Sequence, residues 1–264
     1  MNEPPKYDRI GRSYAKHRSA DPRLVDGIVN ALDLAPASVI ADIGAGCGNY
    51  SRALADRGFQ VRAIEPSSVM REQAQPHSSV EWFQGVAEQV PLADGSVDGV
   101  VVVMALHHFH SVGHAAVEML RVTNGPIVVF TYDPRPAEEF WLSDYFPEIF
   151  ADGFELFPPL ADVAGLFDRA STIRKFELPH DLQDLFLAAG WQRPEIYLDP
   201  EICAGMSVLA LADRQLVQTR IDRLRTDLAS GEWHRRYGPI LERQQFDAGY
   251  RLLRLEPAGR RPSL

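Results

Sequence analysis

The stretch ADIGAGCGN, residues 41–49, carries three glycines in five positions directly after a short apolar run. Glycine lets the backbone turn tightly and approach a ligand, and a helix that follows offers its unpaired N–H groups. The apolar run, residues 39–43, is typical of a buried strand. The pattern therefore predicts the first strand-to-helix turn of an α/β sheet, where such proteins bind their ligands.

The alternation of strand and helix continues through the first half of the chain. Helical spacing begins at Asp21-Pro22, an N-cap followed by proline at the first helical position, and reaches Leu32. Continuous Val and Ile runs between helices indicate a parallel sheet covered on both faces, which is a doubly wound α/β fold. The expected strands are residues 39–43, 60–64, 80–84, 97–106 and 126–132, with helices that end at Gly58, open at Ser67 and cover 112–121.

The second half of the chain departs from this simple alternation. We expect a helix over residues 181–189, a sixth strand at 195–198 and a long helix over 206–228. SGEWHRRYGP, residues 230–239, is rich in turn formers and predicts a break. The last expected element is a strand in GYRLLRLE, residues 249–256.

The spacing of the glycine turn indicates which ligand it binds. The pattern is D-x-G-x-G-x-G, and Asn49 stands where a dinucleotide fingerprint has its third glycine. The Asp42 carboxylate would oppose a pyrophosphate but suits an ammonium or a sulfonium. Glu65, at the end of the second strand, is placed to accept hydrogen bonds from both hydroxyls of a ribose. These residues predict a nucleoside without phosphates and disfavour an NAD-dependent oxidoreductase, which stays the weaker alternative.

Three segments resemble the class I S-adenosylmethionine-dependent methyltransferases, especially the small-molecule group that includes quinone-biosynthesis enzymes. They are VIADIGAGCGNYS, RAIEPSSVM and GVAEQVPLADGSVDGVVVVMALHHF, in this order, within residues 38–132. The resemblance implies S-adenosylmethionine as methyl donor and S-adenosylhomocysteine as product. It also implies a Rossmann-like, seven-stranded, mostly parallel sheet, in which residues 249–256 form the antiparallel seventh strand.

The resemblance also implies which residues meet the cofactor. The methionyl end is expected on residues 44–46, the ribose on Glu65 and the adenine edge on residues 86–88. Many relatives carry Asp where this chain has Val86, so Glu88 or backbone groups would take the adenine amino group instead. With the turn residues above, the expected cofactor site comprises Asp42, Gly44, Ala45, Gly46, Gly48, Glu65, Pro66, Ser67, Val86, Ala87, Glu88, Met104, Tyr14 and Arg18.

Three members of this set have alternative interpretations. Met104, in the fourth strand, is either a core residue or a contact to the adenine. Tyr14 and Arg18 share one face of an expected N-terminal helix, which either packs on the core or, as in relatives, covers the cofactor as a lid.

His107 and His108 follow the fourth strand and are the candidate catalytic residues. The carboxyl end of that strand is where a transferred methyl group must meet its acceptor. A histidine could act as general base there, or the pair could simply close the cofactor pocket. A metal site built from these two with His110 and His114 matches no zinc signature, so no metal is expected.

Aromatic residues gather after the fifth strand. Nine of the 25 aromatics lie in residues 132–167, among several prolines, which is typical of a cap with an apolar pocket for a flat or hydrophobic small molecule. Trp233, His234 and Tyr237 are secondary pocket candidates, with surface packing as the alternative. The expected organisation is a cofactor-binding core with the N-terminal lid helix at 1–132, an aromatic-rich cap insertion at 133–180, and completion of the sheet with helical cap elements at 181–264.

Composition narrows the function further. The net charge of −9 argues against nucleic acid as a partner. The longest apolar run, residues 100–106, is too short for a membrane span, and MNEPPKYDR lacks the apolar region of a signal peptide. We therefore expect a cytoplasmic methyltransferase, monomeric or homodimeric. A non-catalytic protein that binds S-adenosylmethionine or S-adenosylhomocysteine is the alternative.

Overall fold

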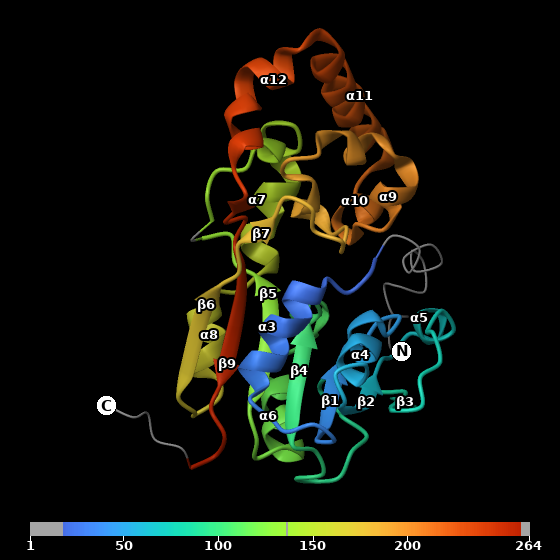
Figure 1. Cartoon of the computed structure of the whole chain (residues 1–264), viewed down its shortest axis with the longest axis vertical. Helices are drawn as coiled ribbons and strands as arrows, with labels where there is room; N and C mark the ends of the chain where they lie inside the picture. The colour runs from blue at the N-terminus through green and yellow to red at the C-terminus, as the bar shows by residue number, and fades with distance from the viewer. Residues whose placement is uncertain (1–17, 136, 260–264) are drawn as a thin grey trace.

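The computed structural model describes residues 18–135 and 137–259 (Figure 1). One sheet of seven strands has the order β3-β2-β1-β4-β5-β9-β6. Strands β1 to β5 are parallel, and β9 pairs antiparallel with both β5 and β6, so the predicted mostly parallel sheet is confirmed. The strands are β1 (Val39–Ile43), β2 (Gln60–Ile64), β3 (Val80–Phe83), β4 (Gly99–Val103), β5 (Ile127–Tyr132), β6 (Ser171–Lys175) and β9 (Tyr250–Leu255).

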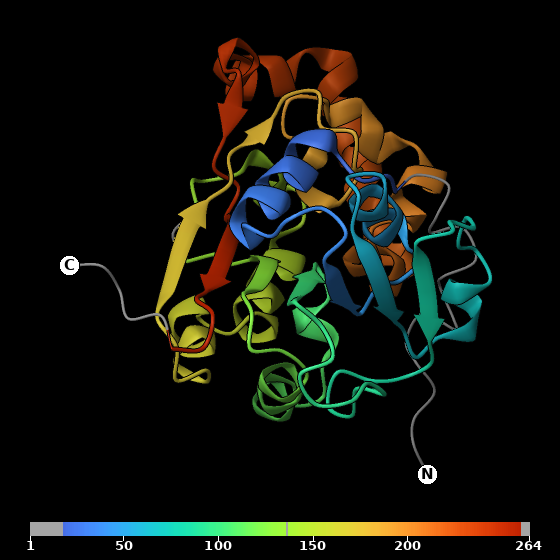
Figure 2. The same ribbon diagram turned by 60° about the horizontal axis from the view of Figure 1, so that its bottom comes forward.

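Helices cover both faces of this sheet (Figure 2). Each face of the sheet has its own hydrophobic core, and neighbouring residues of β4 point into opposite cores. Val101 packs with the helices on one face, and Val100 and Val102 pack with those on the other. This alternation explains why β4 is apolar along its whole length. The helices of the first face are α3 (Pro22–Leu32) and α4 (Asn49–Ala55), those of the second are α6 (Val112–Val122) and α8 (Leu160–Gly165), and the short α5 (Ser68–Arg71) follows β2.

A helical cap lies beyond the sheet, in the upper part of Figure 1. Its interior is aromatic: the Trp141 ring lies 5.2 Å from Trp233 and 5.6 Å from Tyr197, measured between ring centroids. The Trp141 indole N–H donates to the backbone carbonyl of Trp191 at 2.7 Å. The cap contains α7 (Pro147–Leu156), α9 (Pro200–Ala204), α10 (Ser207–Leu211), α11 (Arg214–Ser230), α12 (Glu232–Tyr237) and the paired short strands β7 (Leu178–Pro179) and β8 (Gln245–Phe246).

The sixth strand is not where the sequence pattern placed it. Residues 195–198 belong to a 3₁₀ helix, η5 (Pro194–Leu198), and the sixth strand is β6 instead. All five residues of β6 are exposed at the sheet edge, so STIRK lacks the apolar pattern that marks the inner strands.

Three expectations about helices also need correction. Residues 181–189 form a loop that ends in a 3₁₀ turn, η4 (Leu187–Gly190), rather than a helix. The long helix over 206–228 is divided into α10 and α11, because Asp213 caps α11 by accepting a hydrogen bond from the Leu216 N–H at 2.8 Å. The predicted break at 230–239 contains the short helix α12.

The expected 133–180 insertion does not form one cap unit. Helix α7 belongs to the cap, whereas Leu160, Val163 and Phe167 pack in the core on one face of the sheet, and β6 joins the sheet itself. The lid helix predicted around Tyr14 lies outside the described residues.

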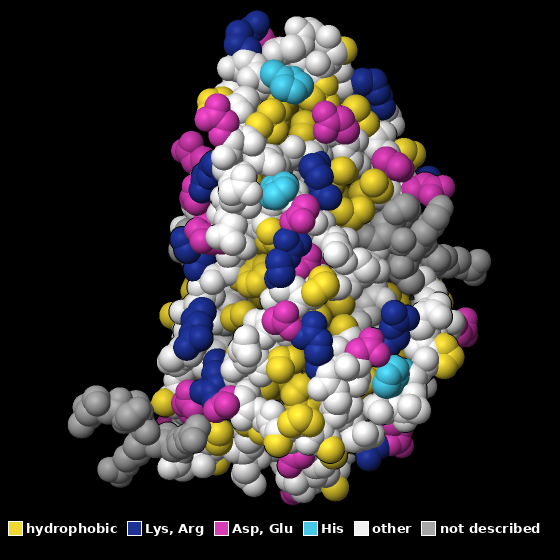
Figure 3. All heavy atoms as spheres, in the orientation of Figure 1, with side chains coloured by type: hydrophobic (Ala, Val, Ile, Leu, Met, Phe, Trp, Pro, Cys, Tyr) yellow, Lys and Arg dark blue, Asp and Glu magenta, His cyan; other side chains and the backbone are white. Residues whose placement is uncertain are grey.

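The surface carries acidic and basic side chains side by side. Figure 3 shows this mixture over the face in view, where no broad region of one charge stands out. Within residues 18–135 and 137–259, no helix is both long and apolar enough to cross a membrane.

Candidate active site

The glycine turn after β1 adopts the left-handed backbone that its sequence predicts. Gly44, Gly46 and Gly48 have φ angles of +79°, +59° and +79°. A Cβ on Gly44 would lie 2.5 Å from Ala105 Cβ, and one on Gly48 would lie 2.6 Å from the Trp82 ring. Two of the three glycines are therefore required by packing as well as by φ.

Glu65, at the end of β2, is fixed by backbone donors. Its Oε2 accepts from the Gly46 N–H at 3.0 Å and its Oε1 accepts from the Ser67 N–H at 2.8 Å, and the residue is 6% exposed. A carboxylate oxygen can accept more than one hydrogen bond, so Glu65 can still receive the two hydroxyls of a ribose. The predicted ribose-binding residue thus lies against the glycine turn in a defined orientation.

A cavity of about 940 Å³ opens over this turn. The volume lies within the range of small-molecule sites. Twelve of the predicted site residues line it: Arg18, Gly44, Ala45, Gly46, Glu65, Pro66, Val86, Ala87, Glu88, Met104, His107 and His108. The structure therefore brings together the three motifs that are separate in the sequence.

Three predicted cofactor residues do not line this cavity. Asp42 is 1% exposed beneath the turn, where the Ser51 hydroxyl donates to its carboxylate at 2.5 Å. Burial raises the pKa of Asp42 and the bond from Ser51 opposes the rise; with a smaller upward contribution from the charge of Glu65, the net pKa is about 6. Ser67 caps α5 by accepting from the Met70 N–H at 3.2 Å, and Gly48 packs on Trp82. Asp42, Gly48 and Ser67 therefore stabilise the turns after β1 and β2. Tyr14, the fourth predicted cofactor residue that is not among those lining the cavity, lies outside the described residues.

In residues 86–88, the stretch expected to contact the adenine, the one acidic side chain already accepts a hydrogen bond within the protein. Glu88 Oε1 accepts from the Ser111 N–H at 2.9 Å, and Val86 bridges to Gln89 in a tight turn. Because Glu88 is held in this way, backbone groups of residues 85–88 are the more accessible partners for an adenine amino group.

A second cavity, of about 570 Å³, lies between the sheet and the cap. Tyr132 at the end of β5 and Phe140, Phe150 and Phe157 of the aromatic segment line it, as the sequence predicted for this segment. Trp233, His234 and Tyr237 do not line it; Trp233 is fully buried in the cap core.

The two cavities meet at three described residues. Arg18, Met104 and His107 line both. Met104 has a φ of +53°, which is strained for a residue with a side chain, and its N–H donates to the Phe130 carbonyl at 2.8 Å. Met104 directly follows the carboxyl end of β4 and lies on the boundary between the cavities.

The two candidate catalytic histidines differ in position. Both belong to η2 (Leu106–His108), with ring centroids 3.8 Å apart, but His108 lines only the larger cavity. The His107 ring lies 4.6 Å from Phe157 of the smaller cavity. Among the residues that the structure describes, no group of three or more His, Cys, Asp or Glu is arranged to hold a metal ion.

Asp184 is a site residue that sequence reasoning missed. It lines the larger cavity, is 1% exposed, pairs with the Arg18 guanidinium and accepts from the Tyr50 hydroxyl at 2.9 Å. No local pattern could identify it, because both partners are more than 130 residues away in sequence.

The fold and site define a class: a doubly wound α/β protein with a ligand cavity on its first glycine turn and an adjoining aromatic cavity under a cap. A family model described as a methyltransferase domain matches residues 41–128. A solved structure from Anabaena variabilis, with the provisional description of a methyltransferase from an antibiotic biosynthesis pathway, is 48% identical. It has a TM-score of 0.88, and the match covers 90% of this chain and 98% of that one. The chain therefore belongs to the class I S-adenosylmethionine-dependent methyltransferases, which confirms the resemblance and the predicted fold.

More distant relatives match in part. The demethylmenaquinone methyltransferase of Renibacterium salmoninarum is 31% identical over 105 residues, which is 39% of this chain and 44% of that relative. The chain spans less than half of the first curated relatives it matches, 44%, 49% and 34% of their lengths. Phosphoethanolamine N-methyltransferase 2 of Haemonchus contortus, solved with S-adenosyl-L-methionine, is 15% identical with a TM-score of 0.58, over 89% of this chain and 52% of that one. That likeness concerns the fold alone.

Proposed function

We propose that this protein transfers a methyl group from S-adenosylmethionine to a small, hydrophobic acceptor. The observation that carries the proposal is the meeting of two cavities at Arg18, Met104 and His107. Methyl transfer needs a donor site and an acceptor site that share one boundary, because the reaction is an in-line displacement. Family membership supports the identity of the cofactor.

The residues of the larger cavity fit this cofactor. Two backbone N–H groups fix the Glu65 carboxylate in the cavity wall, where it can accept from a ribose, and Gly44 and Gly46 leave the turn open to a ligand. When bound, S-adenosylmethionine supplies an electrophilic methyl group on a sulfonium centre. Met104 and His107 line both cavities, so they lie where this methyl group would meet its acceptor.

The smaller cavity fits an uncharged or phenolic aromatic acceptor. Aromatic rings make up much of its wall and exclude water, and no carboxylate stands among the described residues that line it. A cationic amine would find no partner charge there.

His107 is the proposed general base. It is the histidine that faces both cavities, so it can take the proton that an acceptor hydroxyl loses while that acceptor lies against Phe157. His108 lines only the larger cavity, so we propose that it closes the cofactor pocket and is not the base, unlike the catalytic role that the sequence suggested for it. The cytoplasmic location and the monomeric or dimeric state stay predictions.

Parallel titration calorimetry with S-adenosylmethionine, S-adenosylhomocysteine and NADH tests the cofactor. We expect micromolar binding of the two sulfur nucleosides and none of NADH. Turnover of hydroxylated aromatic compounds with labelled S-adenosylmethionine then tests the reaction. Binding without turnover of any acceptor from a cell extract would instead favour the non-catalytic alternative, and binding of NADH alone would contradict the proposal.

A further inference from the structure

We propose that Asp184, which reaches the cofactor cavity from the cap side, binds the α-ammonium of the cofactor's amino-acid end, with Arg18 beside it for the α-carboxylate. This inference rests on the proposed function and assigns a ligand contact to a residue outside the three sequence motifs.

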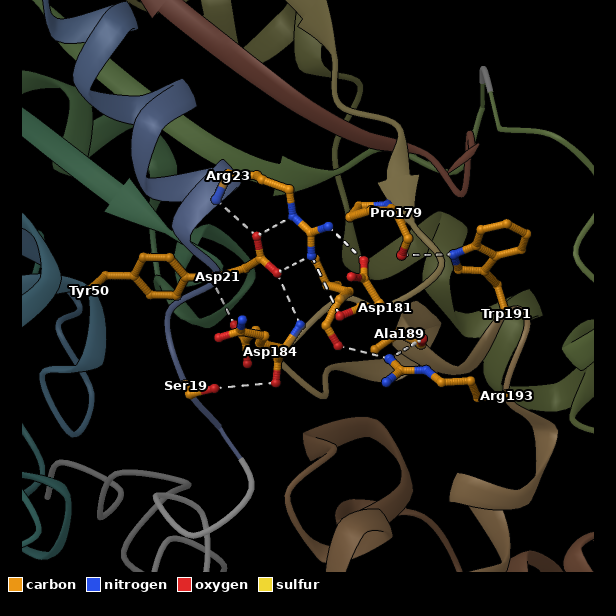
Figure 4. A network of polar contacts seen from close by, with 12 residues as sticks. Ser19, Asp21, Arg23, Tyr50, Pro179, Asp181, Asp184, Ala189, Trp191 and Arg193 are labelled. Carbon is orange, nitrogen blue, oxygen red and sulfur yellow. Dashed lines mark hydrogen bonds and ion pairs between the residues drawn. The ribbon is translucent and has the colours of Figure 1, made fainter. Parts of the chain in front are cut away.

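The first reason is the position of the pair over the glycine turn. The Tyr50 hydroxyl, from the first turn of α4, donates to Asp184 at 2.9 Å (Figure 4). The side chain of Asn49, the preceding residue, donates to the backbone carbonyl of Arg18 at 2.7 Å. Both charged residues are thus tied to the residues that follow Gly48. The pKa of the Cys47 thiol reflects this closeness: burial raises it, Arg18 opposes the rise and Asp184 adds to it.

The second reason is charge. The Arg18 guanidinium and the Asp184 carboxylate form a buried ion pair, with Nη2 and Oδ2 3.1 Å apart. A zwitterion has no net charge, so an amino-acid group that lies head to tail beside this pair leaves the pocket neutral and gives each of its charges an opposite partner. An isolated cation or anion in the same place would leave one buried charge uncompensated.

The third reason is that the other carboxylates of this cavity are already engaged elsewhere. Among the described residues that line the cavity, the Glu65 carboxylate accepts hydrogen bonds from the backbone N–H groups of Gly46 and Ser67. The Glu88 carboxylate accepts one from the Ser111 N–H. Asp184 is the remaining acid, and it has no backbone N–H donor among the described hydrogen bonds. A carboxylate has about four acceptor directions, so Asp184 can accept from an ammonium in addition to Arg18 and Tyr50.

The segment that carries Asp184 is held in place by contacts that do not involve its side chain. The Gln183 N–H donates to Asp21 at 3.0 Å, and Arg23 pairs with Asp181 at 2.6 Å. Arg193 donates to the Leu182 carbonyl at 2.8 Å. Figure 4 shows these contacts around the loop. The Asp184 carboxylate is therefore presented by a fixed loop, and its replacement by asparagine preserves the loop's other anchors.

The test compares ligands with and without the amino-acid end. Titration calorimetry measures the affinity of wild type, Asp184→Asn and Glu195→Gln for S-adenosylhomocysteine and for 5′-methylthioadenosine, which lacks that end. We expect Asp184→Asn to weaken S-adenosylhomocysteine binding by roughly tenfold to a hundredfold and to change 5′-methylthioadenosine binding by less than about twofold. The matched control, Glu195→Gln, alters an exposed acid of η5 that lines neither cavity, and it should change neither affinity.

A second measurement needs no variant. The deaminated analogue of S-adenosylhomocysteine keeps the carboxylate and lacks the ammonium, and it should bind the wild-type protein at least about tenfold more weakly than S-adenosylhomocysteine. Equal losses for both ligands in Asp184→Asn, or equal affinities of the wild type for the deaminated analogue and S-adenosylhomocysteine, would overturn this inference alone. A wild-type protein that binds none of these nucleosides would overturn the proposed function and this inference together.

Discussion

The backbone N–H of Gly46 donates a hydrogen bond to the Glu65 carboxylate, with N and Oε2 3.0 Å apart. This bond joins the turn after β1 to the end of β2, the strand beside it in the sheet. It couples the two parts of the site that are expected to receive different ends of the cofactor. The carboxylate therefore orients the glycine turn, in addition to its proposed role as an acceptor for the ribose hydroxyls.

Glu65→Gln should weaken the binding of S-adenosylhomocysteine by about 1.5 to 3 kcal/mol, because the charge-assisted hydrogen bonds are lost. The amide nitrogen of glutamine would also face one of the two backbone donors, Gly46 or Ser67, and could not accept from it. Titration calorimetry measures the change. Glu72→Gln, at an exposed position just after α5, is the control. An unchanged dissociation constant would sink the ribose assignment.

The variants His107→Gln and His108→Gln should distinguish the roles of the two histidines in turnover. If His107 takes the proton from the hydroxyl of the methyl acceptor, its replacement lowers kcat by a factor of about 10² to 10⁴. The affinity for S-adenosylhomocysteine should be preserved. His108→Gln should retain turnover, because His108 lines only the cofactor cavity. Steady-state kinetics as a function of pH makes the comparison, and the acidic limb of the profile should vanish with His107. Full activity in both variants would mean that the histidines only close the pocket.

The inner strands could be predicted from the sequence because their signals are local. The ranges of β1 and β2 coincide with the strands predicted at 39–43 and 60–64, since most of the buried positions in both strands are apolar. The edge strand β6 faces solvent and carries no such run. The 181–189 segment has helical spacing, yet its contacts with Asp21, Arg23 and Tyr50 hold it as a loop.

Some residues of the candidate site could likewise be predicted from local sequence motifs, and others could not. The glycine turn and Glu65 belong to compact motifs, so their closeness follows from the order of parallel strands. Asp42 belongs to the same motif, but its carboxylate bonds to Ser51 beneath the turn, an orientation that spacing alone does not determine. Asp184 meets the site only through the folding of the cap segment over α4, which no local pattern encodes.

Gly48→Ala and Gly231→Ala should differ in their effect on stability. Both glycines have a φ near +78°, and alanine in that region costs roughly 1 to 2 kcal/mol. A Cβ at position 48 would also lie 2.6 Å from Trp82, whereas one at 231 would meet no atom within 4 Å. Urea unfolding should therefore show a larger loss for Gly48→Ala, by about 1 to 3 kcal/mol beyond the control. Equal losses would mean that Trp82 moves aside without penalty.

Asp42 should make the ligand-free protein less stable as pH rises. Its pKa in the folded protein, about 6, lies above the ordinary value of 3.8. The contribution of Asp42 to the free energy of unfolding is therefore fully present below pH 3.8 and is lost as pH rises through 6. A difference of about two units corresponds to a change of up to about 3 kcal/mol.

Asp42→Asn keeps the shape of the side chain and removes the titration, so the stability difference between wild type and variant isolates this residue. Urea unfolding between pH 4 and pH 7 should show that difference moving against the wild type as pH rises. In Ser51→Ala the bond that opposes the rise in pKa is gone, and the same transition should move to higher pH. A difference that stays constant across this range would mean that Asp42 is ionised in the folded protein throughout, despite its burial.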